Sequence, residues 1–132
     1  MTKTPFTLAT TTELSFDEAT AAARDALASE GFGVLCEIDV QATLKAKLDV
    51  DREPYVILGA CNPALAHRAL SAEPEIGALL PCNVVVYCRD GVTHVSAIDA
   101  ERLLSLVQDE QLAPIAADVS ERLRRVIASF ES

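Results

Sequence analysis

Residues Tyr55-Val56-Ile57-Leu58-Gly59-Ala60-Cys61 form a short apolar run, and Cys82-Asn83-Val84-Val85-Val86-Tyr87-Cys88 form a second one. Both runs are apolar at odd and even positions, which is typical of strands that are covered on two faces. Arg89-Asp90-Gly91 then leads into residues 92–98, and Asp-Gly between two strand patterns predicts a β-hairpin. The runs therefore predict the antiparallel centre of a sheet.

A strand and a helix are predicted before these runs. Residues 6–14 alternate with period two and are rich in threonine, which predicts the first strand. Ser15 and Glu18 have the spacing of a capping box, so a helix is expected to begin here. Gly31 can adopt the left-handed conformation that ends a helix.

The remaining pattern supplies further helices and one more strand. In chain order we expect a strand over residues 32–40, a short helix through Leu44 and Leu48, a helix from Asn62-Pro63 to about Ala72, a short helix capped by Asp99, and a last amphipathic helix over residues 115–130. This order predicts an α+β fold, a two-layer sandwich with helices packed on a mainly antiparallel sheet of about five strands. The length of 132 residues suits a single domain spanning residues 1–132.

Charge and hydropathy narrow the classes of partner. The chain has 11 basic and 20 acidic residues and a formal net charge of -9, which disfavours nucleic acid and anionic membranes. Neither a signal peptide nor 18 consecutive apolar residues occurs, so we expect a cytoplasmic protein without a membrane span. The four cysteines are then expected to remain thiols.

Three segments resemble the domain-of-unknown-function family numbered 302. They are Ile57-Leu58-Gly59-Ala60-Cys61-Asn62-Pro63, Ala72-Glu73-Pro74-Glu75-Ile76-Gly77, and Leu80-Pro81-Cys82-Asn83-Val84-Val85-Val86-Tyr87, and Gly31-Phe32-Gly33-Val34 with Glu37-Ile38-Asp39-Val40 is similar to the family's second strand. The resemblance covers nearly the whole chain and implies a small α+β domain found as a homodimer. It implies no reaction, and Cys88 stands where the family usually has an acidic residue.

The best chemical candidates are Cys61 and Cys82, each followed by an asparagine. If their strands are antiparallel neighbours, the end of one strand meets the start of the other and the thiols come close. Cys61 also precedes a helix start, which would lower the pKa of its thiol. His67, about one turn into that helix, would complete a set for a metal or a redox centre.

Structural roles compete with these functional ones. Cys61 and Cys82 are also explained as small buried side chains, as are Cys36 and Cys88, and His67 as a surface residue. Asn62 is explained by its helix cap, whereas Asn83, an amide among valines, is expected to anchor a loop, bind a ligand or meet a partner subunit. We expect Glu37 and Asp39 to face solvent, His94 to lie on the surface of the hairpin, and Arg122, Arg124 and Arg125 to form a solvated helix end.

Two hypotheses of function follow, and no motif specifies a reaction or a cofactor. The first is a dimeric binding or sensing module that holds a small molecule or a metal near Cys61, Asn62, Cys82 and Asn83. The second is a thiol-dependent redox protein or enzyme in which Cys61 is the nucleophile, Cys82 resolves it and His67 moves a proton. Strands that are apolar on both faces independently predict a homodimer.

Overall fold

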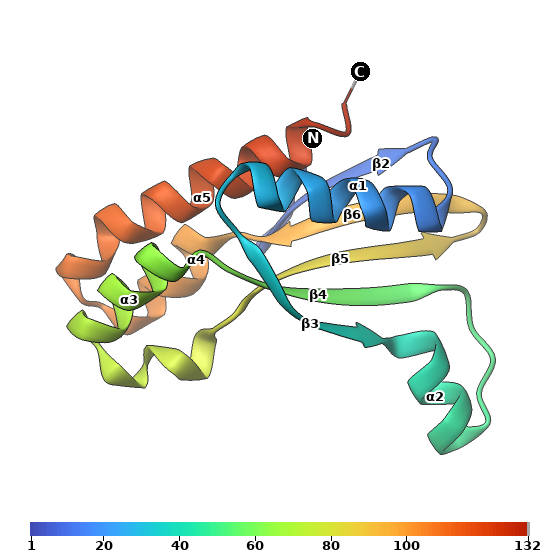
Figure 1. The fold of residues 1–132 in the computed structure, drawn as a ribbon, viewed down its shortest axis with the longest axis horizontal. Helices are drawn as coiled ribbons and strands as arrows, with labels where there is room; N and C mark the ends of the chain where they lie inside the picture. Colours follow the sequence, from blue (N-terminus) through green and yellow to red (C-terminus); the bar gives the residue numbers. More distant parts are fainter. Residues whose placement is uncertain (132) are drawn as a thin grey trace.

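A computed structural model describes residues 1–131 and confirms the α+β class. Six strands form one antiparallel sheet in the order β1-β2-β6-β5-β4-β3 (Figure 1). The strands are β1 Thr2–Lys3, β2 Thr7–Thr12, β3 Gly33–Asp39, β4 Tyr55–Cys61, β5 Cys82–Arg89 and β6 Val92–Ile98. The helices are α1 Phe16–Ser29, α2 Val40–Leu48, α3 Pro63–Ala72, α4 Ala100–Leu104 and α5 Ala113–Ala128, with short 3-10 turns η1 Pro74–Leu79, η2 Ser105–Val107 and η3 Glu110–Leu112.

Local sequence features fix the ends of these elements as predicted. Ser15 and Glu18 form the capping box of α1, and Gly31, just beyond its end, has a φ of +83°. Asp90 and Gly91 both have positive φ and join β5 to β6, as a tight hairpin requires. The Asp99 carboxylate accepts a hydrogen bond from the backbone N–H of Arg102 and caps α4.

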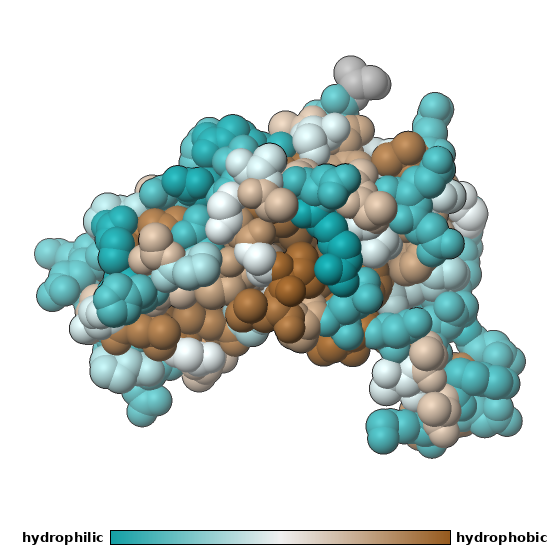
Figure 2. Space-filling model, viewed as in Figure 1, coloured by the Kyte–Doolittle hydropathy of each residue, from teal (hydrophilic) through white to brown (hydrophobic). Residues whose placement is uncertain are grey.

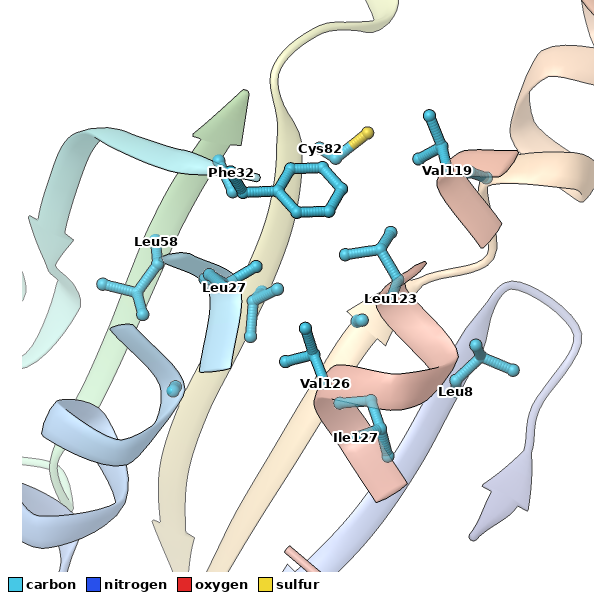
Figure 3. Close-up of a cluster of buried hydrophobic side chains, with 14 of the residues drawn as sticks. Leu8, Leu27, Phe32, Leu58, Cys82, Val119, Leu123, Val126 and Ile127 are labelled. Carbon is cyan, nitrogen blue, oxygen red and sulfur yellow. The ribbon is translucent and has the colours of Figure 1, made fainter. Parts of the chain in front are cut away.

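The hydrophobic core lies between one face of the sheet and the helices α1 and α5 (Figure 3). Alternate residues of the central strands point into it, and α5 supplies a long buried stripe. The largest fully buried side chains are Leu8, Leu27, Leu58, Ile76, Leu112, Leu123, Ile127, Val84, Val86, Val95 and Val126. Burying these side chains is the main source of stability in a sheet and helix layer of this kind.

Two expectations about the sheet need correction. The sheet has six strands rather than about five, because the two-residue β1 is too short to leave a pattern in the sequence. Within a single chain the strands β4 and β5 are not buried on both faces, since Val56 and Val86 are buried whereas Ile57 and Val85, on the opposite face, are only half-buried. Within residues 1–131 no helix is long and apolar enough to cross a membrane.

The helix α2 stands apart from the two layers (Figure 1). None of its residues is buried, although Asp39 caps its start and Asp49 ends it in a left-handed conformation. Leu48 is 67 % exposed, and Val50 and Ile38 nearby are also exposed. The strand β3 and helix α2 thus form an arm with uncovered apolar side chains.

Candidate functional site

A pocket of about 310 Å³ opens where β4 ends and β5 begins. Its walls come from α3, η1, the ends of both strands and the helices α4 and α5. Residues lining it are Phe32, Leu35, Ala60, Cys61, Asn62, Leu65, Ala66, Ala69, Leu70, Ile76, Gly77, Leu80, Pro81, Cys82, Leu104, Ile115 and Val119. Figure 2 shows hydrophobic residues gathered at the surface between α3 and β3, in agreement with this apolar lining.

Asn62 holds the junction between β4 and α3. Its Oδ1 accepts a hydrogen bond from the backbone N–H of Leu65 at 3.2 Å, and Pro63 occupies the first turn of the helix. This is the cap that the sequence predicts. It makes the chain turn at the pocket, so that Cys61 and Asn62 lie on the pocket wall and α3 forms one side.

The two cysteines singled out in the sequence both line this pocket. The strands β4 and β5 are antiparallel neighbours, as predicted, and Ala60 is paired with Cys82, which places Cys61 one residue beyond that pair. All four cysteines are free thiols. Cys82 is only 8 % exposed and lies beside Phe32 on the core side of the sheet (Figure 3).

Burial controls the acidity of Cys82. Desolvation, with a smaller contribution from the neighbouring Cys61, raises the pKa of the Cys82 thiol to about 11. The protonated thiol is therefore the form present at neutral pH. A protonated, buried thiol is a poor nucleophile and a poor metal ligand.

His67 and Asn83 do not join the cysteines. His67 is exposed on α3 and lines a separate hollow together with Arg68, because Leu65 and Ala69 define the inward face of that helix. Asn83 is exposed on β5, on the face opposite the helices, and so does not reach the pocket. The predicted Cys, Cys, His set is not assembled, and among residues 1–131 no group of at least three His, Cys, Asp or Glu side chains is placed to hold a metal ion.

The two carboxylates of β3 have structural roles. Glu37 forms an ion pair with Arg24 of α1 at 3.1 Å. Asp39 accepts a hydrogen bond from the backbone N–H of Ala42 at 2.9 Å and so caps α2. Both carboxylates are therefore explained without a ligand.

The comparisons with known proteins agree with this fold. The model of the family described as "Domain of unknown function DUF302" matches residues 8–130. The chain belongs to this family. The crystal structure of an uncharacterized conserved DUF302 protein from Bacillus stearothermophilus is 32% identical in sequence, covers 96% of this chain and 98% of that chain, and superposes with a TM-score of 0.89. No curated protein matches the chain.

Most of the pocket walls in this DUF302 protein were not singled out from the sequence. Phe32, Ile76, Leu80 and Val119 lie far apart in the chain and look like ordinary core residues in the sequence. The available indication is the repeated use of alanine on α3, where short side chains leave space that longer ones would fill. Cys36, expected to pack inside its strand, is instead exposed on the edge strand β3.

A ladder of stacked rings on the helix-free face of the DUF302 sheet was also missed. Tyr55 stacks on Tyr87 with ring centroids 5.2 Å apart, and Tyr87 stacks on His94 with centroids 4.7 Å apart. Arg52 lies over the Tyr55 ring, 4.9 Å from its centroid. The ladder crosses β4, β5 and β6 because the antiparallel register pairs Tyr55 with Tyr87 and Tyr87 with His94.

Proposed function

We propose that this DUF302 protein is a binding module that holds a small molecule, without turnover, in the pocket lined by Cys61, Asn62 and Cys82. The observation that carries the proposal is the pocket itself. Its volume of about 310 Å³ is at the lower end of the range typical of small-molecule sites. An apolar hollow beside a few polar groups is the usual composition of such a site.

The alternative, a thiol-dependent redox protein or enzyme, has less support. A resolving cysteine attacks the oxidised sulfur of the first cysteine as a thiolate, and the raised pKa of Cys82 opposes this form. The histidine that was expected to move the proton, His67, lies on the outer face of α3. The pocket therefore favours reversible binding over nucleophilic chemistry.

We also propose that the module is a homodimer, with the arm formed by β3 and α2 in the interface. An isolated helix as short as α2 is barely stable in water, and apolar burial normally supplies the missing free energy. Leu48 on this arm and Val50 just beyond it are exposed, and the helix-free face of the sheet carries the half-buried Tyr55, Ile57 and Val85. A second copy, related by a twofold axis, would cover both arms with one self-complementary surface.

The binding proposal is tested by filling the pocket. Ala66 lines it, whereas Ala64, on the same helix, is exposed and does not. We expect Ala66→Leu to weaken binding of the neutral probes 2-nonanone and butylbenzene by at least tenfold, and Ala64→Leu to leave it unchanged. Binding is measured by titration in two-dimensional amide NMR spectra, following the signals of Phe32, Cys61 and Cys82.

Each outcome bears on the proposal. Shifts at these amides in the natural protein and in Ala64→Leu, but not in Ala66→Leu, support it. If neither millimolar 2-nonanone nor saturating butylbenzene shifts the amide signals of Phe32, Cys61 and Cys82 in the natural protein, the pocket is not a small-molecule site. Equal binding by both variants would place the probes elsewhere and would also overturn the proposal.

A further inference from the structure

We infer that the pocket takes the end of a hydrocarbon chain, up to about ten carbon atoms long, and that the polar head of this ligand stays in water outside the pocket. The inference rests on the proposed function, because it names the chemical class of ligand for the same site. It follows from the apolar lining of the pocket, from the orientation of Asn62, from the exposed leucines at the rim and from the volume.

The lining favours a ligand group that makes no hydrogen bonds. Almost all the surface that the pocket exposes belongs to apolar atoms, and none of the residues that line it is charged. Burial raises the pKa of the Cys82 thiol to about 11, so this thiol stays protonated at neutral pH and behaves as a small apolar group. A hydroxyl, an amide or a carboxylate would lose its hydrogen bonds to water on entering the pocket and would find no replacement.

Asn62 is the one amide side chain among the lining residues, and its polar ends are engaged outside the pocket. Its Oδ1 accepts the hydrogen bond from the backbone N–H of Leu65 that caps α3. Its Nδ2 lies toward Gly31, where a Cβ would come within 3.0 Å of Nδ2 and 3.7 Å of Nη1 of Arg122. Neither Gly31 nor Arg122 lines the pocket. Asn62 therefore shapes the wall without offering a hydrogen bond to a ligand.

Two leucines at the rim indicate where the chain leaves the pocket. Leu35 and Leu70 both line the pocket although both are exposed to water. Leu35 has no partner in β4, because the register of β3 shifts between Val34 and Cys36, and a bulge of this kind re-aims a side chain. The hydrophobic surface between α3 and β3 in Figure 2 agrees with an apolar rim. A chain that continues from the pocket into water can cover these leucines, which adds apolar burial at the mouth.

Volume limits the length of the enclosed chain. At the roughly 30 Å³ that a water molecule occupies in the liquid, a pocket of about 310 Å³ holds about ten non-hydrogen atoms. Hexyl, octyl, decyl and dodecyl maltoside are suitable probes, each used below its critical micelle concentration. Their disaccharide head is uncharged and too large for the pocket, so only the chain can enter.

Chain length should control affinity up to this limit. From hexyl to decyl maltoside we expect binding to tighten about fifteenfold with each added pair of CH₂ groups, the effect of burying them. Dodecyl maltoside should bind less than about threefold more tightly than decyl maltoside, because its additional carbons stay outside. 1,8-Octanediol should bind at least about tenfold more weakly than 1-octanol, because only one of its two hydroxyls can remain in water. Binding is followed by the amide NMR signals of Phe32, Cys61 and Cys82.

The decisive variant is Ala66→Leu, which adds an isopropyl group to the wall of the pocket. It should shorten the longest chain that still gains affinity by about three carbon atoms, so that the gain ends between hexyl and octyl maltoside. Ala64→Leu adds the same group to an exposed position of α3 outside the pocket, and it should leave the limit at decyl maltoside. Circular dichroism shows whether both variants are folded.

The titrations separate failure of this inference from failure of the binding proposal. If butylbenzene shifts the three amide signals but no maltoside does, the binding proposal stands and the inference of an enclosed chain end is wrong. The inference is also wrong if 1,8-octanediol binds as tightly as 1-octanol, or if Ala66→Leu keeps the limit at decyl maltoside. If maltosides bind only as the subunits dissociate in sedimentation, a second copy fills the pocket, which overturns the inference as well. If neither the maltosides nor butylbenzene nor 2-nonanone shifts these signals, both proposals fail.

Discussion

Arg122 of α5 donates a hydrogen bond from Nη1 to the carbonyl oxygen of Glu30, 92 residues earlier in the chain, at 2.9 Å. This carbonyl belongs to the residue that ends α1, where backbone acceptors lack partners within the helix. Arg125 adds a second link, because its guanidinium forms an ion pair with the Glu30 carboxylate at 2.8 Å. Of the three arginines expected to form a solvated helix end, Arg124 stays on the surface, whereas Arg122 and Arg125 also tie α5 to the end of α1.

Replacing Arg122 with alanine should therefore destabilise the fold. We expect the free energy of unfolding to fall by about 1 to 3 kcal/mol, because a charged donor is lost from an acceptor that has no replacement. Urea denaturation followed by circular dichroism measures this change. Arg124→Ala is the control, since within residues 1–131 Arg124 pairs only with Glu121, at 3.7 Å on the surface, and should change stability by less than about 0.5 kcal/mol. Equal effects of the two substitutions would remove the special role of Arg122.

A second prediction concerns the close approach of β3 and β4. A Cβ on Gly59 would lie 2.5 Å from Sγ of Cys36 and 2.9 Å from Cγ of Pro81, whereas a Cβ on Gly33 would meet nothing within 4 Å. Gly59→Ala should cost about 1 to 3 kcal/mol of stability through overpacking. Gly33→Ala should change it by less than about 1 kcal/mol.

The double variant Gly59→Ala with Cys36→Ala identifies the cause. Removing the sulfur relieves the nearer clash but leaves Pro81, so thermal and urea denaturation should show partial recovery relative to Gly59→Ala alone. If the double variant is as unstable as the sum of the two single variants, the contact with Cys36 does not limit residue 59.

The elements with local signals were predictable from the sequence. Ser15, Asn62 and Asp99 each cap the helix that they were expected to cap, and Asp90-Gly91 makes the predicted hairpin. These signals act within a few residues of the chain, where backbone geometry and one side chain determine the outcome. The closeness of Cys61 and Cys82 was predictable because it needs only one antiparallel pairing, in which the end of β4 meets the start of β5.

What could not be predicted depends on contacts between distant segments. The pocket needs Phe32, Ile76 and Val119 at once, and nothing in the sequence near any of them indicates the others. Asn83 was grouped with the cysteines as a candidate ligand residue, yet whether it faces the pocket depends on which face of β5 receives the helices. His67 lies on the outer face of α3, in agreement with its interpretation as a surface residue, because Leu65 and Ala69 mark the inward face of that helix.

The raised pKa of Cys82 predicts a dependence of stability on alkaline pH. Its pKa rises from 9.0 to about 11 on folding, so between these values the folded chain keeps a proton that the unfolded chain has lost. The stabilisation is fully present below pH 9 and disappears as the pH rises through 11. It amounts to a few kcal/mol at most, at about 1.4 kcal/mol for each pKa unit.

Comparison with Cys82→Ala isolates this group from tyrosine and lysine titration. Between pH 8 and pH 11, the free energy of unfolding of the natural protein should fall by about 1 to 3 kcal/mol more than that of Cys82→Ala. The two proteins are compared by urea denaturation at each pH. Parallel curves across this range would show that Cys82 ionises equally easily in the folded and unfolded chains.

The homodimer proposal predicts that one charge on the arm separates the subunits. Leu48 of α2 is 67 % exposed, and placing a carboxylate there would bury an unpaired charge in the proposed interface. Leu48→Glu should therefore sediment as a monomer at micromolar concentrations at which the natural protein sediments as a dimer. Leu106→Glu is the matched control, since Leu106 is 72 % exposed on η2, which directly follows α4 at the other end of the molecule from α2 (Figure 1), and this variant should remain dimeric. A monomeric natural protein would contradict the dimer, and a dimer unaffected by Leu48→Glu would remove the arm from its interface.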